Sequence, residues 1–355
     1  MKMSFKIKTD ALKAGMILAD DVYWNGNLLL SKGIVVKNDY IIKLITRGVS
    51  KVTILADKTY YDDIFLNPVE KFYAETYEAL AKILEKLKEE DKISISDIFP
   101  IVENILEAIY SSQNAILSLT GLRGEKNYYY SHSLDVCIYS LIAARVMNLR
   151  FEDAVTLGIG AILHDIGKGR IPSEILFKKE KLSSDEFEEV KKHSEYGYDI
   201  LIKCPQVNYS VLQIVLQHHE RVNGTGYPKQ IYGKDMNFLS KIVAIADIYD
   251  AMTSDRVYKK KILPHEAAEY LHSISDTLID GEIAKVFINN IAIYPNGCQV
   301  LLNTNEIAIV IESNSNAPLR PVLKIITDRL RNPISVPRRL ELEKSPKVSI
   351  TQVFS

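Results

Sequence analysis

The sequence predicts a mainly α-helical protein with a small β-containing module at each end. Apolar residues recur at three- and four-residue spacing through a long region, from about residue 113 to residue 290. Near the N-terminus, residues 22–24 and 28–30 flank Asn25-Gly26, which favours a hairpin because both turn positions tolerate positive φ. After Gly297 the apolar period shifts to two, which indicates strands.

The elements follow in order from local pattern. Residues 34–49 predict a strand and then a short helix closed by Gly48, and residues 52–55 predict another strand. A helix is expected from Pro68 to about Glu90, ended by a charged segment, and a second from about Ile95. Near the C-terminus, the sequence predicts a hairpin and one further strand, in residues 298–302, 307–311 and 322–327.

Four regions are expected from this pattern. They are a β-hairpin module in residues 1–62, a helical connector in 63–112, a helical domain in 113–292 and a β module in 293–355.

Charge and cysteine content exclude several classes of protein. The 44 Lys+Arg and 45 Asp+Glu residues give a net charge of -1, so no global field attracts DNA or RNA duplexes. Three cysteines, Cys137, Cys204 and Cys298, form no C-x-x-C pair, which argues against a disulfide framework and a thiolate zinc site. The sequence shows no apolar leader and no stretch of membrane-spanning length. We therefore expect a cytoplasmic protein.

Histidines and aspartates gather in the apolar helical segments. The candidates are His132, His164, Asp165, His193, His218, His219 and Asp247. Taken singly, none of them settles the question, and His132 and His193 are each more simply a satisfied core histidine. Together they form a mixed imidazole and carboxylate set that exceeds the four positions of one tetrahedral zinc. Such a set suits two divalent transition-metal ions, iron or manganese, that share a bridging water.

The two aspartates are the most telling members. Asp165 lies at the end of an apolar run, where a carboxylate is costly unless it is paired or bound to metal. The simpler alternative is that it caps a helix near Gly167. Asp247 shares a helical face with Asp250 and Val243 in an otherwise apolar segment. For Asp250, a salt bridge to Arg256 or Lys168 is the alternative, while for Asp247 we favour ligation.

The histidines are placed by helical spacing. His193 is expected on the inner face of a helix that opens with the capping-box pattern of residues 183–186 and also carries Phe187. His218 continues a core-facing stripe, and His219 lies about 100° further round, so the pair could serve two different ions. His265 and His272 fall outside the pattern and are expected to be structural or exposed.

Cations and a loop supply candidate substrate contacts. Arg256 and Lys259 have the spacing to grip phosphate together, and a solvated basic run is the alternative for the neighbouring Lys260 and Lys261. Lys168 follows His164 by four residues and could reach a phosphate oxygen. The glycine-rich loop that contains Gly226 and Tyr227 could bring backbone N–H groups and an aromatic ring close to a base or phosphate.

Laid side by side, these segments resemble the HD-GYP family of metal-dependent phosphohydrolases. The resemblance covers about residues 125–290 and is specific in order and spacing. It rests on Ser131-His132-Ser133-Leu134, His164-Asp165-Ile166-Gly167-Lys168, Lys192-His193, His218-His219-Glu220-Arg221, Gly224-Thr225-Gly226-Tyr227-Pro228, and residues 247–258.

The resemblance implies a fold, a reaction and residue roles. The fold would be an HD-domain bundle of five core helices plus extra helices, and the seven candidates would be metal ligands. The reaction would be hydrolysis of cyclic di-GMP to pGpG by a hydroxide that two metals activate, with Asp165 and Lys168 as catalytic residues. The substrate-binding residues would be Lys168, Gly226, Tyr227, Arg256 and Lys259.

Two positions depart from the family pattern. Members with three metals carry a glutamate one turn before the first histidine, where this chain has Tyr128, so we expect two metals and leave open whether pGpG is cut further to GMP. Asn223 replaces a frequent aspartate and keeps the turn. The alternative functions are a cyclic di-GMP sensor or protein-docking module, and a hydrolase of another phosphoester. A homodimer through the helix after Pro68, or a signalling-protein partner, is a further expectation.

Overall fold

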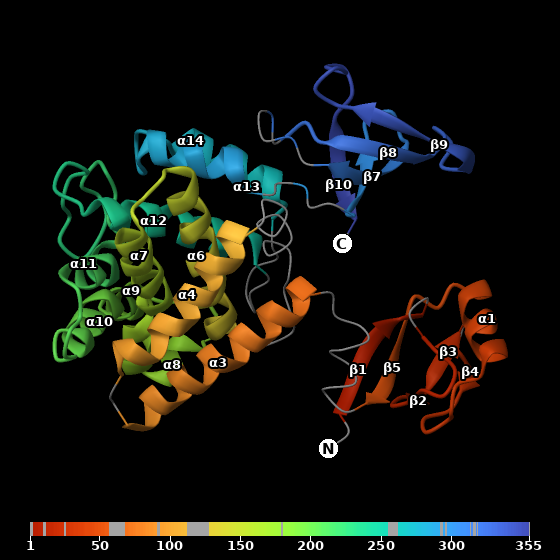
Figure 1. The fold of residues 1–355 in the computed structure, drawn as a ribbon, viewed down its shortest axis with the longest axis horizontal. Coiled ribbons are helices and arrows are strands. Elements are labelled where there is room, and N and C mark those ends of the chain that lie inside the picture. Colours follow the sequence, from red (N-terminus) through yellow and green to blue (C-terminus); the bar gives the residue numbers. More distant parts are fainter. Residues whose placement is uncertain are drawn as a thin grey trace. The chain divides into compact units, whose positions relative to one another are not determined.

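The structure is a computed structural model that describes most of the chain. It covers residues 3–9, 12–24, 26–56, 68–90, 93–111, 128–178, 180–254, 262–291, 294, 297–312, 314, 317 and 319–354. The chain divides into two compact units, Met1–Ala74 and Glu75–Ser355, and Figure 1 shows the elements of each. The predicted fold class, mainly helical with small β modules, is confirmed.

The N-terminal unit is a small β structure with one helix. Strands β1 (Met3–Lys8), β5 (Lys51–Ala56) and β2 (Ile17–Leu18) form an antiparallel sheet in the order β1-β5-β2. The predicted hairpin is present as β3 (Val22–Trp24) and β4 (Asn27–Leu30), and the predicted short helix as α1 (Asn38–Thr46). The strand expected at residue 34 is wrong, because its pairing is reduced to an isolated bridge between Ile17 and Val35.

Helices make up the body of the second unit. Their bounds are α3 Pro68–Glu90, α4 Ile95–Ser111, α6 Tyr128–Val146, α7 Phe151–Leu163, α8 Ser173–Leu176, α9 Ser184–Lys191, α10 His193–Leu201, α11 Tyr209–Gln217, α12 Phe238–Thr253, α13 Pro264–Ile274 and α14 Gly281–Asn290. A 3₁₀ helix, η2 (Ile166–Arg170), follows α7. Among the described residues, none of these helices has both the length and the apolar character needed to cross a membrane.

Four of the helices form a closed ring around the core. Helix α6 packs on α7, α7 on α11, α11 on α12, and α12 again on α6, and Figure 1 shows these helices in one bundle. In α6 every residue from 132 to 144 is buried, as expected of a helix surrounded by other elements. A polar side chain placed on α6 therefore enters the interior of the bundle.

Helices α7 and α11 approach each other closely at a glycine. A Cβ atom at Gly160 of α7 would lie only 2.4 Å from the Cδ1 atom of Ile214 on α11. One helical turn later on the two helices come His164 and His218. The absence of a side chain at Gly160 therefore brings these two histidines together at the ends of their helices.

The segment around His193 differs from the sequence-based prediction. Ser183 and Glu186 form the expected capping box, but the helix is interrupted at Lys192 and divides into α9 and α10. Phe187 was expected on the inner face and is 48% exposed. Phe187 and His193 thus belong to different helices, and His193 is buried whereas Phe187 is not.

The C-terminal residues form a five-stranded antiparallel sheet in the order β10-β6-β7-β8-β9. Three strands, β6 (Gln299–Leu302), β7 (Ile307–Glu312) and β8 (Val322–Thr327), confirm the predicted hairpin and strand. The prediction missed β9 (Pro333–Glu341) and β10 (Ile350–Phe354). Alternating residues of β6 to β8, such as Val300, Val310 and Leu323, are buried and form the core of this sheet.

Candidate metal centre

All seven predicted ligand residues lie together at one end of the four-helix ring. His132 comes from α6, His164 and Asp165 from the end of α7, and Asp247 from α12. His193 begins α10, and His218 and His219 follow the end of α11. Residues up to 115 positions apart are thus side by side, with His132 Nε2 3.2 Å from Asp247 Oδ1.

The donor atoms form two groups that share one aspartate. One group comprises Asp165, His193, His218 and His219, and the other comprises His132, His164 and Asp165. In each group the candidate donor atoms lie within 4.8 Å of one another. Asp247 adjoins both groups, because its Oδ1 lies near His132 and its Oδ2 is 3.7 Å from His219 Nδ1. The arrangement could hold metal ions.

Three of the histidines are oriented in the same way. His164, His193 and His218 each follow the last turn of a helix, and the Nδ1–H of each donates to the backbone carbonyl three residues earlier. The N···O distances, to Ala161, Val190 and Val215, are 2.7, 2.7 and 2.9 Å. These carbonyls lie in final helical turns, which lack intrahelical partners. Each bond also fixes the tautomer, so the Nε2 atom of each neutral ring keeps a lone pair.

His132 is oriented by a carboxylate instead. Its Nδ1–H donates to Asp250 Oδ2 at 2.7 Å, and Ser254 Oγ donates to Asp250 Oδ1 at 2.9 Å. Asp250 is fully buried one turn beyond Asp247 on α12. A carboxylate on the far nitrogen of an imidazole orients the ring and increases the basicity of the other nitrogen. The sequence pattern placed Asp250 near the site without identifying this partner.

The chemistry of the donors fits a bound cation. The Nε2 atoms of His193 and His218 lie 3.2 Å apart, and both rings use their Nδ1 hydrogen elsewhere. Among the described residues, neither His164 Nε2 nor Asp165 Oδ1 has a hydrogen-bond partner although both are buried. Lone pairs that face one another without a hydrogen between them need a positive charge. The C-terminal ends of α7 and α11 favour a cation as well.

Burial and mutual charge shift the acidities within the cluster. Burial lowers the pKa of His193 to about 4, against the opposing charge of Asp165. Burial also holds the pKa values of His218 and His219 well below the usual histidine range. Burial likewise acts to lower the pKa of His132, but its hydrogen bonds with Asp247 and Asp250 raise it to about 9.

The two aspartates remain ionised despite burial. Burial acts to raise the pKa of Asp165, but the Lys168 ammonium and the His164 ring hold it well below its usual range. For Asp247, the hydrogen bond with His132 and the charge of His219 outweigh burial, and its pKa is also far below normal. Buried anions next to neutral imidazoles are the donor set that divalent transition metals take.

Asp165 does not act as a helix cap. It occupies the position before η2, but its side chain makes no capping hydrogen bond. Its Oδ2 instead lies 2.5 Å from Lys168 Nζ and 3.4 Å from His164 Nε2, while its Oδ1 lies 3.4 Å from His193 Nε2. The capping alternative is therefore wrong, and the carboxylate faces the histidines.

Close backbone packing brings His193 to Asp165. A Cβ atom at Gly167 of η2 would lie 1.9 Å from the His193 carbonyl oxygen and 2.4 Å from the Gly197 nitrogen. A Cβ atom at Gly197 would lie 2.6 Å from Val215 Cγ1 of α11. Neither glycine leaves space for a side chain, so three segments meet at a distance only glycine permits.

Glu220 is a residue that the sequence analysis quoted without assigning a role. Its side chain is buried, with Oε1 accepting from the backbone N–H groups of Lys229 and Gln230 at 2.6 and 3.0 Å. Its Oε2 accepts from the N–H of Ile231 at 3.2 Å. Glu220 thus holds the end of the glycine-rich loop. The available signal was an acidic residue between a histidine pair and a glycine-rich loop.

The loop folds back onto the histidines. The Tyr227 ring stacks on His219 with centroids 4.7 Å apart, and the Tyr227 N–H donates to the His219 carbonyl at 3.2 Å. Gly226 is buried, and a Cβ atom there would lie 2.3 Å from Glu220 Cα. Asn223 Oδ1 accepts from the Thr225 N–H at 3.1 Å, so asparagine stabilises the turn as expected.

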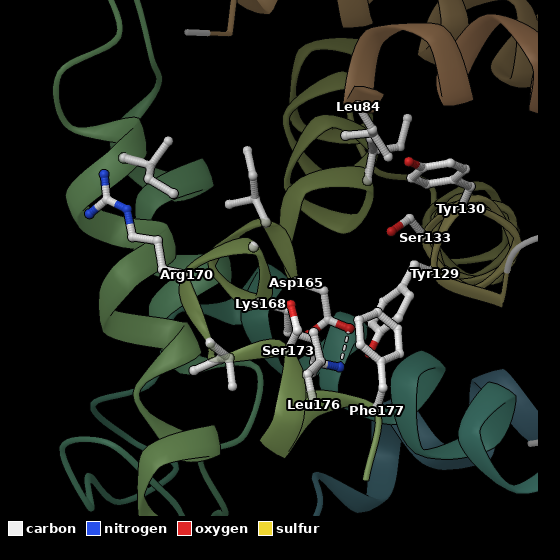
Figure 2. A pocket seen from close by; sticks show the side chains of 15 residues that line it. Leu84, Tyr129, Tyr130, Ser133, Asp165, Lys168, Arg170, Ser173, Leu176 and Phe177 are labelled. Carbon is white, nitrogen blue, oxygen red and sulfur yellow. Dashed lines mark hydrogen bonds and ion pairs between the residues drawn. The ribbon is translucent and has the colours of Figure 1, made fainter. Parts of the chain in front are cut away.

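Of the basic residues predicted to contact the substrate, the structure describes only one, Lys168. Figure 2 shows Lys168 beside Asp165, with the ion pair drawn as a dashed line. Arg256 and Lys259 lie outside the described residues, as does the side chain of Tyr128. His265 stacks on Tyr294 and His272 is exposed on α13, in agreement with structural or exposed roles.

Comparisons with known proteins agree with this arrangement. Residues 122–283 match the model of the family described as HD domain, and residues 299–355 match that described as KOW domain associated with HD domain. A solved structure from Bdellovibrio bacteriovorus, Bd1817, described as an HDG"Y"P protein, superposes with a TM-score of 0.53 at 19% identity. The superposition covers 81% of this chain and 99% of that chain, and it is a likeness of fold.

Two curated relatives carry enzyme names. The chain is 34% identical over 242 residues to cyclic di-GMP phosphodiesterase PA4108 of Pseudomonas aeruginosa, covering 68% of this chain and 58% of that protein. It is 30% identical over 183 residues to 3'3'-cGAMP-specific phosphodiesterase 3 of Vibrio cholerae, covering 52% of this chain and 38% of that protein. The chain thus spans less than two thirds of the length of either relative. The predicted HD-GYP resemblance is confirmed, and residues 122–283 match the HD domain family.

Proposed function

We propose that this protein is a metal-dependent phosphodiesterase that hydrolyses a cyclic dinucleotide, with cyclic di-GMP as the first candidate substrate. The observation that carries the proposal is Asp165, whose two oxygens face two groups of buried donors. The names of the curated relatives support the class of substrate.

Two divalent ions, iron or manganese, are proposed for the two groups of donors. One ion would be held by His132, His164 and Asp165 with Asp247 adjacent, and the other by Asp165, His193, His218 and His219. Such a pair supplies a nucleophile at neutral pH and neutralises charge on the reacting phosphate. Tyr128 in place of a glutamate argues against a third ion.

The chain's own residues prepare the site for a phosphate. The carbonyl and carboxylate partners of the Nδ1 atoms keep the Nε2 atoms aimed inward without rearrangement. Lys168 balances the charge of Asp165 and lies where its ammonium can also donate to a phosphate oxygen. Gly226, Tyr227, Arg256 and Lys259 remain proposed substrate contacts.

3'3'-cGAMP is the second candidate substrate. It differs from cyclic di-GMP in one base, and a relative of this chain is named for it. The metal-binding residues would act on the phosphodiester of either compound, so discrimination has to come from residues that contact the bases.

The decisive experiment couples metal analysis to turnover. Protein freed of metal is loaded with manganese or with iron, and the bound metal is counted by mass spectrometry. Cyclic di-GMP and 3'3'-cGAMP are then offered separately, and the products are separated by chromatography. We expect pGpG from cyclic di-GMP with at least one ion, and the yield of GMP reports whether the second bond is cut.

The outcomes separate the alternatives. A filled site that yields no product from either nucleotide contradicts the phosphodiesterase proposal. Nucleotide binding without hydrolysis would instead support a sensor. Hydrolysis of unrelated phosphoesters at equal rates would indicate a broader phosphohydrolase. Light scattering of the same sample tests the expected homodimer.

A further inference from the structure

A cavity adjoins the metal centre at Asp165 and Lys168. Its volume is about 330 Å³, and it lies between α6, the η2–α8 segment and Leu84 of α3 (Figure 2). Asp165 and Lys168 form part of its wall. The cavity therefore shares the aspartate that belongs to both groups of candidate ligands.

One wall of the cavity is aromatic. The rings of Tyr129 and Phe177 meet edge to face, with centroids 5.9 Å apart and planes at 84°. The Lys168 ammonium lies 6.0 Å above the Tyr129 ring, and the Phe177 residue is 58% exposed. Leu84 and Leu176 add aliphatic surface. An apolar space with one charged end suits a ligand that combines a flat ring system with a phosphate.

We propose that this cavity binds one nucleoside of the substrate, with its base against Tyr129 and Phe177 and its phosphate at Asp165 and Lys168. The proposal rests on the proposed function, because it assigns the cavity to the same substrate. Aromatic side chains attract nucleobases through stacking, which tolerates different bases because every base has an aromatic face. Phe177 then determines the affinity for the base, whereas the candidate metal ligands act on the phosphate.

The test separates the base from the phosphate. GMP and ribose 5-phosphate carry the same phosphomonoester, but only GMP carries a base. Binding of each compound to the metal-loaded protein is measured by isothermal titration calorimetry. We expect GMP to bind more tightly, and Phe177→Ala to weaken GMP about tenfold while leaving ribose 5-phosphate unchanged. Phe177→Tyr, which keeps an aromatic face, should restore GMP binding.

A matched control is available on the same domain. Phe151 opens α7, is 56% exposed and does not line the cavity. Phe151→Ala should leave the affinities for both compounds as in the wild type. If Phe177→Ala weakens both compounds equally, or weakens neither, the cavity is not a base-binding site and the proposal is overturned.

The result is independent of the proposed function. A protein that binds GMP through Phe177 but hydrolyses no cyclic dinucleotide keeps the nucleoside site and loses the phosphodiesterase assignment. A protein that hydrolyses cyclic di-GMP with unchanged kcat/KM and GMP affinity in Phe177→Ala keeps the activity and loses the nucleoside site.

Discussion

The two groups of candidate ligands orient their histidines by different means. In the group with His193 and His218, the Nδ1 hydrogens go to neutral backbone carbonyls. In the group with His132, the Nδ1 hydrogen goes to the buried carboxylate of Asp250. The other histidine of this second group, His164, also donates to a backbone carbonyl, so only the His132 ring has a negative charge behind it.

The difference appears in the acidity of the rings. Burial lowers the pKa of His193 to about 4, so this ring is neutral at pH 7. Against the same effect of burial, Asp247 and Asp250 raise the pKa of His132 to about 9, so this ring holds a proton when no metal is bound. A carbonyl partner therefore orients a ligand, whereas a carboxylate partner also changes its affinity for cations.

The largest effect is expected at the residue that both groups share. Asp165→Ala removes a carboxylate from each group and should abolish both metal binding and turnover. Metal counting by mass spectrometry and hydrolysis of cyclic di-GMP measure the two effects. Asp153→Ala on the same helix, at an exposed pair with Arg150, is the control. Retention of both metals in Asp165→Ala would show that the two groups are independent.

A smaller effect on metal binding is expected when Asp250, the hydrogen-bond partner of His132, is substituted. Asp250→Asn keeps the shape and an acceptor oxygen but removes the charge, and should lower metal affinity by about 10–100-fold. Competition with a chelator measures this affinity. Ser254→Ala removes only the bond from Ser254 to Asp250, and its effect should be milder. Equal affinities in wild type and Asp250→Asn would mean that the carboxylate only orients the ring, as the carbonyls do.

The smallest effect is expected in the pH dependence of the metal-free protein. An unfolded histidine titrates near pH 6.5, so the raised pKa of His132 stabilises the fold below that pH and its contribution is lost as pH rises toward 9. The lowered pKa of His193 has the opposite sign, with stability present above pH 6.5 and lost as pH falls toward 4. Each slope is at most about 1.4 kcal/mol per pH unit.

Thermal unfolding across the pH range measures both slopes. Asp250→Asn should flatten the alkaline slope and leave the acidic one, because Asp250 accepts a hydrogen bond from His132, whereas His193 donates to the carbonyl of Val190. An alkaline slope that is identical in wild type and Asp250→Asn would contradict the assignment to His132.

Much of the candidate site could be predicted, because the residues next to each candidate in the sequence indicate whether its side chain is buried. Asp165 and Asp247 interrupt apolar runs, which marks each as buried before any fold is known. The partner of His132 could not be found in this way. Asp250 lies 118 residues further along the chain, and the contact exists only because α6 packs on α12.

At the level of the fold, the predictions failed where strand pairing or an interruption of a helix decides the structure. Strand β9 pairs with β8 without a clear alternation of apolar residues, so its sequence does not indicate a strand. Strand β1 was missed although Met3, Phe5 and Ile7 alternate with polar residues, and it pairs with β5 along its length. The division of α9 from α10 falls at Lys192, and apolar spacing does not encode it. Gly160 and Gly167 likewise show their role only through the segments that contact them.

The histidines that follow helix ends suggest a rule for protein design. The final turn of a helix has carbonyl groups in need of a donor, and a histidine placed directly after it can supply the Nδ1–H. The same bond then fixes the ring and its tautomer, so the Nε2 lone pair remains available for a metal ion. His164, His193 and His218 repeat this arrangement on three helices. A designer could therefore build a rigid donor set by choosing where helices stop, without adding a separate supporting residue for each ligand.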